Sequence, residues 1–344
     1  MKLQDYSFFG DNLWIHNDGG NENKIYKIDS LNGNSIQNIV VENAENVDWE
    51  DFAENESYLF LGDFGNNSGN RMDLKIYRIN KSDLSQDTVS AELINFVYSD
   101  QVDFSENPNN NNFDCEAFIF QNGQLHLFSK NWVDYQTKHY TLSPEPGTQT
   151  AQLKETYDIN GLITGADISD DSQIVLLGYN ELGFIFMWIL FDFEQSDFFS
   201  GNKRRIELGT ALTNSQTEGI AFRENGYGYI CSEKFTVNNQ IILPPKLLSF
   251  SIKQWTDFTN PVENVKWQKH FKVYPNPSKN FIKVESIYKS KLQWNLYSST
   301  GYLIKKGILE DDKTKIDTSN LKSGNYFFVL FDNEKRTTIP IAVK

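Results

Sequence analysis

The 344-residue sequence predicts an all-β protein, a β-propeller over residues 1–270 followed by a smaller all-β domain over residues 271–344. Helix-type periodicity is almost missing, and short β-branched and aromatic runs alternate with clusters of Asn, Gly, Asp and Ser. These runs recur in a fixed order about every 50 residues, and four antiparallel strands per repeat are typical of a propeller, which arranges its sheets around a central channel.

The first strand of each repeat carries an acidic residue next to a short hydrophobic run. It occurs at 48–53 (DWEDFA), 113–118 (FDCEAF), 164–168 (TGADI) and 217–222 (TEGIAF). The acidic residues in question, which are 66, 51 and 51 residues apart, are Glu50, Glu116, Asp167 and Glu218. Because the innermost strand of every blade lines the channel, we predict that these four side chains lie around one axis.

The second strand of each repeat is an apolar run that ends in a small residue and then a polar one. It occurs at 59–63 (LFLGD), 125–130 (LHLFSK), 175–179 (VLLGY) and 228–233 (GYICSE). Third strands such as 75–79 (KIYRI) and fourth strands such as 91–97 (AELINFV) complete the unit. The N-terminal part adds one unit with strands at 13–17 and 24–28, so we count five blades, with six possible.

The first unit has no recognisable innermost strand. Only residues 1–9 and a short turn precede Leu13, and no acidic motif stands there. Either the segment near residues 262–267 closes the ring, or the chain begins late and has lost one inner strand. We favour the second interpretation, because the sequence also opens without the basic and apolar regions of a signal peptide.

Composition and charge limit the possible functions. Hydrophobic residues make up 39% of the chain and aromatic residues 14%, which is enough for a packed core. No apolar run reaches the roughly 18 residues of a transmembrane helix. Residues 1–270 carry 19 Lys and Arg against 39 Asp and Glu, and residues 271–344 carry 13 against 7. The acidic propeller region is therefore not expected to bind nucleic acid, and its field favours cations.

The repeated acidic residues predict chemistry at the channel. Carboxylates that face one another raise one another's pKa unless a cation lies among them. Calcium is the expected occupant, because it accepts six to eight oxygen ligands in flexible geometry. The candidate metal ligands are Glu50, Glu116, Asp167 and Glu218. Two alternatives remain open: the acids bond backbone N–H groups of the next blade and keep the blades in register, or they act directly in catalysis.

Polar residues that end or follow the second strands are candidate ligand-binding residues at the same mouth of the channel. They are Asn17, Asp63, Asn66, Lys130, Tyr179 and Glu233. The oxygens of Asn17, Asp63 and Asn66 are suited to complete the coordination of a bound cation. The pattern leaves open whether the ligand is a small molecule, a glycan or a protein.

Other candidate groups predict little chemistry. The four histidines, His16, His126, His139 and His270, stand at unrelated points of the repeat and form no pair at metal-ligand spacing. Cys115 and Cys231 lie in apolar strands and are expected to be buried thiols. The motifs G-x-S-x-G, P-loop and H-E-x-x-H are absent from the sequence, which argues against the common nucleophilic, phosphate-loop and zinc chemistries.

The last 74 residues carry four landmarks in order. They are 273–278 (VYPNPS), 294–301 (WNLYSSTG), 316–326 (IDTSNLKSGNY) and the basic end at 339–344 (IPIAVK). This segment resembles the type A C-terminal sorting domain of the type IX secretion system of Bacteroidetes. The resemblance implies a seven-stranded immunoglobulin-like sandwich, export by the type IX machinery, and a protein that is secreted or attached to the outer-membrane surface.

Motifs in the repeat carry a second, looser resemblance. They are 17–20 (NDGG), 48–51 (DWED), 62–67 (GDFGNN) followed by Arg71, 115–117 (CEA) and 217–219 (TEG). With these motifs, residues 11–235 resemble secreted propellers of the SdiA-regulated and esterase-like phytase type. Our leading hypothesis is an extracellular binding module, and the alternatives are a Ca²⁺-dependent hydrolase of phosphate esters or lactones and a structural surface protein.

Overall fold

The computed structural model describes residues 3–9, 12–29, 33–224, 226–233, 235–237, 240–256, 270–287, 292–299, 301–309, 313–332 and 336–344. The chain divides into two compact units, residues 1–256 and 257–344, and each is considered by itself. Both are built from strands. The α-helices among the described residues are single turns, α1 (Ala211–Asn214) and α2 (Lys253–Thr256), and no described helix is long and apolar enough to cross a membrane.

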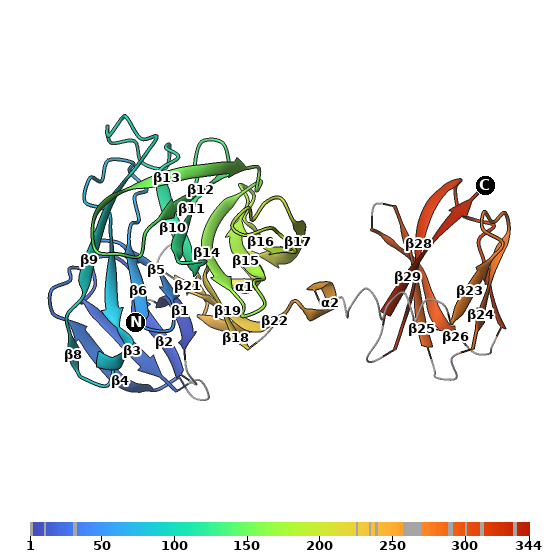
Figure 1. The fold of residues 1–344 in the computed structure, drawn as a ribbon, viewed down its shortest axis with the longest axis horizontal. Helices are drawn as coiled ribbons and strands as arrows, with labels where there is room; N and C mark the ends of the chain where they lie inside the picture. Colours follow the sequence, from blue (N-terminus) through green and yellow to red (C-terminus); the bar gives the residue numbers. More distant parts are fainter. Residues whose placement is uncertain are drawn as a thin grey trace. The chain divides into compact units, whose positions relative to one another are not determined.

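The N-terminal unit is a five-bladed β-propeller, shown from blue to yellow in Figure 1. Blade 1 contains β1 (Leu3–Phe9), β2 (Asn12–Asn17), β3 (Lys24–Ile28) and β4 (Ser35–Val41). Blade 2 contains β5 (Trp49–Glu54), β6 (Tyr58–Asp63), β7 (Lys75–Asn80) and β9 (Glu92–Tyr98). Blade 3 contains β10 (Asp114–Gln121), β11 (Gln124–Lys130), β12 (Thr137–Leu142) and β13 (Gly147–Tyr157).

The last two blades follow the same antiparallel order. Blade 4 contains β14 (Leu162–Ile168), β15 (Ile174–Tyr179), β16 (Phe184–Phe191) and β17 (Asn202–Thr210). Blade 5 contains β18 (Thr217–Glu224), β19 (Tyr227–Ser232) and β22 (Lys246–Ser251), with the hairpin β20 (Phe235–Val237) and β21 (Gln240–Leu243) inserted before β22. Two parallel pairings join neighbouring blades at their outer edges: β8 (Thr88–Val89) adds to β4, and β9 pairs with β13.

The innermost strands close a ring. In cyclic order, β1 lies beside β5, then β10, β14 and β18, and β18 lies beside β1 again. The prediction that blade 1 lacks an innermost strand was therefore wrong, because β1 takes that place and pairs with β2 along its length. Strand pairing requires a backbone register and not the acidic motif on which the prediction relied. The other proposed closing segment, residues 262–267, lies outside the described residues.

The propeller core lies between the blades, because alternate side chains of each strand face opposite neighbours. On β6, Leu59 and Leu61 pack in the core between blades 1 and 2, whereas Phe60 packs in the core between blades 2 and 3. On β2, Leu13 and Ile15 face blade 5 and Trp14 faces blade 2. Both faces of these strands are buried, and this explains why the second strands are continuous apolar runs in the sequence.

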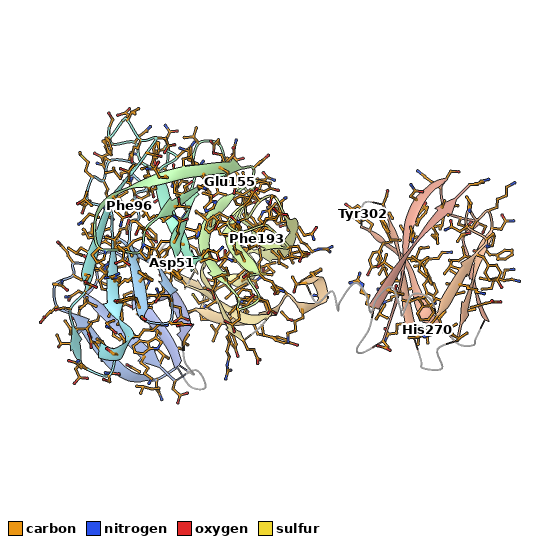
Figure 2. All side chains as sticks on the ribbon, in the orientation of Figure 1. Asp51, Phe96, Glu155, Phe193, His270 and Tyr302 are labelled. Carbon is orange, nitrogen blue, oxygen red and sulfur yellow. The ribbon has the colours of Figure 1, made fainter. Side chains whose placement is uncertain are left out.

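The C-terminal unit is a seven-stranded sandwich in the described residues, as the sequence predicts. One sheet contains β23 (Phe271–Tyr274), β24 (Phe281–Ser286) and β27 (Lys313–Asp317). The other contains β26 (Leu303–Leu309), β25 (Leu292–Ser298), β28 (Gly324–Phe331) and β29 (Arg336–Val343), in that order. The two sheets share one apolar core, which includes Ile282, Leu296 and Phe328. Figure 2 marks His270 and Tyr302, which directly precede β23 and β26.

Candidate functional site

The inner strands bulge near their N-terminal ends, and the acidic residues stand in these bulges. The register with the second strand shifts between Trp49 and Phe52, between Cys115 and Ala117, and between Thr217 and Ile220. The residues that the bulges leave unpaired include Glu50, Glu116 and Glu218. A bulge redirects a side chain out of the regular alternation, and so three of the four predicted metal ligands occupy equivalent places.

Asp167 does not belong to this group. In β14 the register shift falls between Ile163 and Gly165, three places before Asp167, which pairs regularly with Val175 of β15. The Asp167 carboxylate accepts hydrogen bonds from the backbone N–H groups of Ile168 and of Phe222 on the next blade, at 2.8 and 2.6 Å. For this residue the structure shows the alternative in which an acid links neighbouring blades.

Lys130, at the end of β11, forms an ion pair with Glu116 and lies near enough to Glu50 and Glu218 for its charge to act on them. Its Nζ lies 2.5 Å from Glu116 Oε1, and its charge also lowers the pKa of Glu50 and of Glu218. The Glu50, Glu218 and Lys130 side chains are buried, and Glu116 is nearly so. We call Glu50, Glu116, Glu218 and Lys130 the acid–lysine cluster. Tyr179 borders it, with its ring centroid 5.4 Å from Lys130 Nζ.

Burial dominates the electrostatics of the acid–lysine cluster. It raises the pKa of Glu50 well above its usual value, and the charges of Glu116 and Asp48 add to this effect. Burial also raises the pKa of Glu116 to about 8 and that of Glu218 to about 7, although Lys130 opposes both shifts. Lys130 itself stays charged, because the surrounding carboxylates hold its pKa well above the usual value despite its burial. The cluster therefore carries protons near neutral pH.

Half-buried acidic residues extend the cluster toward the surface. Burial, followed by the charge of Asp114, raises the pKa of Asp48 to about 6, and the charge of Glu233 raises the pKa of Glu218. Gly65 is packed against these groups. A Cβ at that position would lie 2.1 Å from Glu50 Oε1 and 2.3 Å from Asp48 Oδ2, so a side chain there would displace both carboxyl groups. We had not predicted Asp48 as a site residue, although it stands two places before Glu50.

Three predicted ligand-binding residues make structural contacts outside the cluster. Asp63 is fully buried and accepts hydrogen bonds from Arg71 Nη2 at 2.8 Å and from the Asp48 backbone N–H at 3.1 Å. The Asn66 N–H donates to Asp114 Oδ1 at 2.7 Å, which connects blades 2 and 3. Asn17 Nδ2 donates to Tyr26 Oη at 3.2 Å. Of the predicted ligand-binding residues, Lys130, Tyr179 and Glu233 therefore accompany the acids.

Asp51, which directly follows Glu50, shows how an acid joins two blades. Its Oδ2 accepts a hydrogen bond of 2.8 Å from the Phe118 N–H on β10, and its Oδ1 accepts one of 2.7 Å from its own neighbour, the Phe52 N–H. Asp51 is buried in the middle of the propeller (Figure 2). The sequence analysis missed this role, although alternation along the strand predicts that Glu50 and Asp51 point in different directions.

The structure also pairs two histidines that the sequence analysis had judged unrelated. His126 Nδ1 and His139 Nε2 lie 2.9 Å apart across β11 and β12, and His139 Nδ1 lies 3.2 Å from Glu155 Oε1. Antiparallel pairing brings together these two residues, which are 13 positions apart, and both are strand residues, as the sequence predicts. Burial lowers the pKa of His126 to about 4, so this fully buried pair is neutral and structural.

In the described parts of the chain, the cysteine, histidine and acidic side chains form neither a disulfide nor a preformed metal site. Cys115 and Cys231 are buried thiols, as expected, and they are not joined in a disulfide. Within the residue ranges that the structure describes, no three His, Cys, Asp or Glu side chains converge closely enough to hold a metal ion. The predicted calcium site therefore remains a prediction, and the cation that the structure places among the acids is Lys130.

Comparison with known families identifies the C-terminal unit. Residues 272–344 match the family described as the secretion system C-terminal sorting domain. The C-terminal unit is a type IX sorting domain. The sorting domain marks the protein as secreted or attached to the cell surface. No curated protein matches the chain.

Several solved structures are similar to the chain at low sequence identity. PorZ, a surface component of the type IX secretion system of Porphyromonas gingivalis, is 14% identical with a TM-score of 0.38; the match covers 99% of this chain and 45% of PorZ. The chain thus spans less than half the length of PorZ. The PQQ-bound aldose sugar dehydrogenase of Streptomyces coelicolor is 7% identical with a TM-score of 0.42, and the match covers 73% and 94% of the two chains. The Cps50 propeller domain of Myceliophteria thermophila is 9% identical with a TM-score of 0.33, covering 95% and 93%.

Proposed function

We propose that the propeller is an extracellular binding module that takes a cation at the acid–lysine cluster. The observation that carries the proposal is that three carboxyl groups with raised pKa values, those of Glu50, Glu116 and Glu218, lie near enough to Lys130 for its charge to act on all three. Their raised pKa values mean that the cluster holds protons near neutral pH. A cation that displaces these protons would be attracted by the carboxylates that it leaves ionised.

Calcium is the cation that we propose first, because it is a hard ion that accepts several carboxylate oxygens. Glu116 Oε2 is buried and accepts no hydrogen bond, so one oxygen of the cluster is available as a ligand. Since the carboxylates do not converge on one point, binding requires Glu50 and Glu218 to rotate inward and Lys130 to withdraw from Glu116. Asp48, which is half-buried and whose charge raises the pKa of Glu50, adds a further carboxyl group beside the cluster.

Calorimetric titration of the purified protein with Ca²⁺ after chelator treatment tests the proposal. We expect one saturable site and release of protons, which is measured as a dependence of the binding enthalpy on the ionisation enthalpy of the buffer. The variants Glu50→Gln and Glu218→Gln should each weaken binding about fivefold or more, since each removes a charge worth roughly 1–4 kcal/mol at close range. The exposed Glu106→Gln serves as the matched control. Absence of saturable binding, or equal binding by all variants, would refute the cation site.

A Ca²⁺-dependent hydrolase of phosphate esters or lactones is the alternative function. It is favoured by the pKa of about 7 at Glu218, because a group that titrates near neutral pH suits a general base. The same variants distinguish the two functions. In a hydrolase, Ca²⁺-dependent turnover of a phosphate monoester or a lactone disappears in both Glu50→Gln and Glu218→Gln. In a binding module, the wild-type protein binds Ca²⁺ without turnover.

A further inference from the structure

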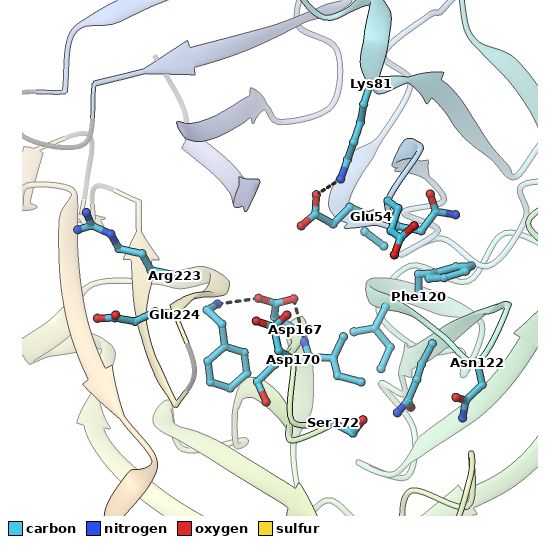
Figure 3. A pocket seen from close by; sticks show the side chains of 17 residues that line it. Glu54, Lys81, Phe120, Asn122, Asp167, Asp170, Ser172, Arg223 and Glu224 are labelled. Atoms are coloured by element: carbon cyan, nitrogen blue, oxygen red, sulfur yellow. Dashed lines mark hydrogen bonds and ion pairs between the residues drawn. The ribbon is translucent and has the colours of Figure 1, made fainter. Parts of the chain in front are cut away.

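We propose a second binding site, for an organic cation, at the C-terminal ends of the inner strands. A cavity of about 510 Å³, which we call the axial pocket, opens there (Figure 3). Four blades line it, through residues 53–56 with 81, 119–122, 167–170 with 172, and 222–224. Its volume lies in the range of small-molecule sites and equals that of roughly 17 water molecules, which is far more than a bare metal ion fills.

The charges of the axial pocket favour a positively charged ligand. Five carboxyl groups line it, against the two cationic side chains Lys81 and Arg223; the five are Glu54, Glu56, Asp167, Asp170 and Glu224. Lys81 is already paired with Glu54. Burial raises the pKa of Glu54, and Lys81 opposes this shift. The charge of Asp170 adds to the shift, so the carboxyl groups of Glu54 and Asp170 lie near enough to repel each other. Besides Glu54 and the hydrogen-bonded Asp167, the carboxyl groups of Glu56, Asp170 and Glu224 then face one guanidinium group, that of Arg223.

Asp167 gives the pocket a fixed acceptor. Its carboxylate accepts the N–H groups of Ile168 and Phe222, and both bonds are drawn in Figure 3. Because these donors belong to blades 4 and 5, the position of the carboxylate is set by the packing of the blades and not by a mobile loop. A ligand that binds there does not have to order the Asp167 side chain first, which lowers the cost of binding.

The apolar part of the lining argues for an alkyl stem on the ligand. Phe120 is half-buried, and its ring stacks on Phe60 with centroids 5.8 Å apart, which fixes its orientation. Ile119, Ile168 and Phe222 line the same cavity. An ammonium or guanidinium group on a hydrocarbon chain matches this combination, since the chain packs on the apolar side chains while the head group meets the carboxylates. Free polyamines and the side chains of Lys- or Arg-rich peptides both have this chemistry.

Calorimetric titration of the full-length protein with spermidine and, separately, with trilysine tests this inference. We expect one saturable site for at least one of the probes, and the double variant Asp170→Asn, Glu224→Gln should weaken its binding about tenfold or more. Binding of spermidine alone identifies a free polyamine as the source of the cation, and binding of trilysine identifies a peptide. Both results support the site.

The matched control is the double variant Asp87→Asn, Glu106→Gln, which removes two exposed carboxylates of the propeller away from the axial pocket. It should bind the probe as the wild type does. Failure of both probes to saturate the wild type, or equal weakening in the control, would overturn the inference. The variants separate the two proposed sites. Glu50→Gln should leave binding of the organic cation unchanged, whereas the Asp170→Asn, Glu224→Gln variant should leave Ca²⁺ binding unchanged.

Discussion

At the N-terminal ends of the inner strands, Glu50, Glu116 and Glu218 are buried with Lys130, whereas at the C-terminal ends Asp170 and Glu224 border an open cavity. Acidic residues stand at both ends of the channel, but they are buried at one end and exposed to solvent at the other. Buried carboxyl groups need an internal countercharge or a proton, while exposed ones keep their charge for a ligand. The position of an acid along a propeller strand therefore decides whether it shapes the protein or its binding properties.

Removing the internal countercharge should have the largest effect. Lys130→Met leaves the nearly buried Glu116 without its ion-pair partner, and we expect it to lower the free energy of unfolding by about 3–5 kcal/mol. Urea denaturation at pH 7, followed by tryptophan fluorescence, measures this change. The matched control is Lys154→Met on the exposed side of β13, where we expect less than about 0.5 kcal/mol. Equal midpoints for the two variants would show that Lys130 does not hold the cluster together.

Asp51 and Asp167 each join two blades, and we expect the loss of stability on replacement to be larger for the buried Asp51 than for Asp167 beside the pocket. Asp51→Ala leaves the buried N–H of Phe118 without an acceptor, and we expect a loss of about 1–3 kcal/mol in the free energy of unfolding. Asp167 makes the equivalent bond beside the axial pocket, where water can replace the lost acceptor, so Asp167→Ala should cost less. Thermal and urea denaturation of both variants gives the ranking. A larger loss for Asp167→Ala would contradict the difference in solvation between the two ends.

The last effect depends on pH. Folding raises the pKa of Glu218 from 4.5 to about 7, so its contribution to stability is fully present below pH 4.5 and is lost as the pH rises through 7. Glu218→Gln cannot titrate, and its stability relative to the wild type should therefore increase between pH 4.5 and 7. Urea denaturation at several pH values measures this difference. A difference that stays constant over the range would mean that Glu218 is ionised throughout.

The five-bladed architecture could be predicted because the strand types recur in a fixed order, and the sorting domain because its landmarks are sequence motifs. The site was predicted only in part. Glu50, Glu116 and Glu218 were aligned correctly, but Asp167 was grouped with them because counting along the sequence does not reveal where a bulge inserts a residue. Similarly, the pairing of His126 with His139 depends on the register of β11 and β12, which composition does not determine.

The parallel pairing of β9 with β13 has a mechanical consequence. It joins blades 2 and 3 by backbone hydrogen bonds along the rim, so that their strands form one continuous sheet. Glu50 and Glu116 both stand in this sheet, on β5 and β10, whereas Glu218 stands on blade 5, whose described strands do not pair with it. A change in the spacing of the blades would therefore alter the distances from Glu218 to Glu50 and Glu116 more than the distance between Glu50 and Glu116.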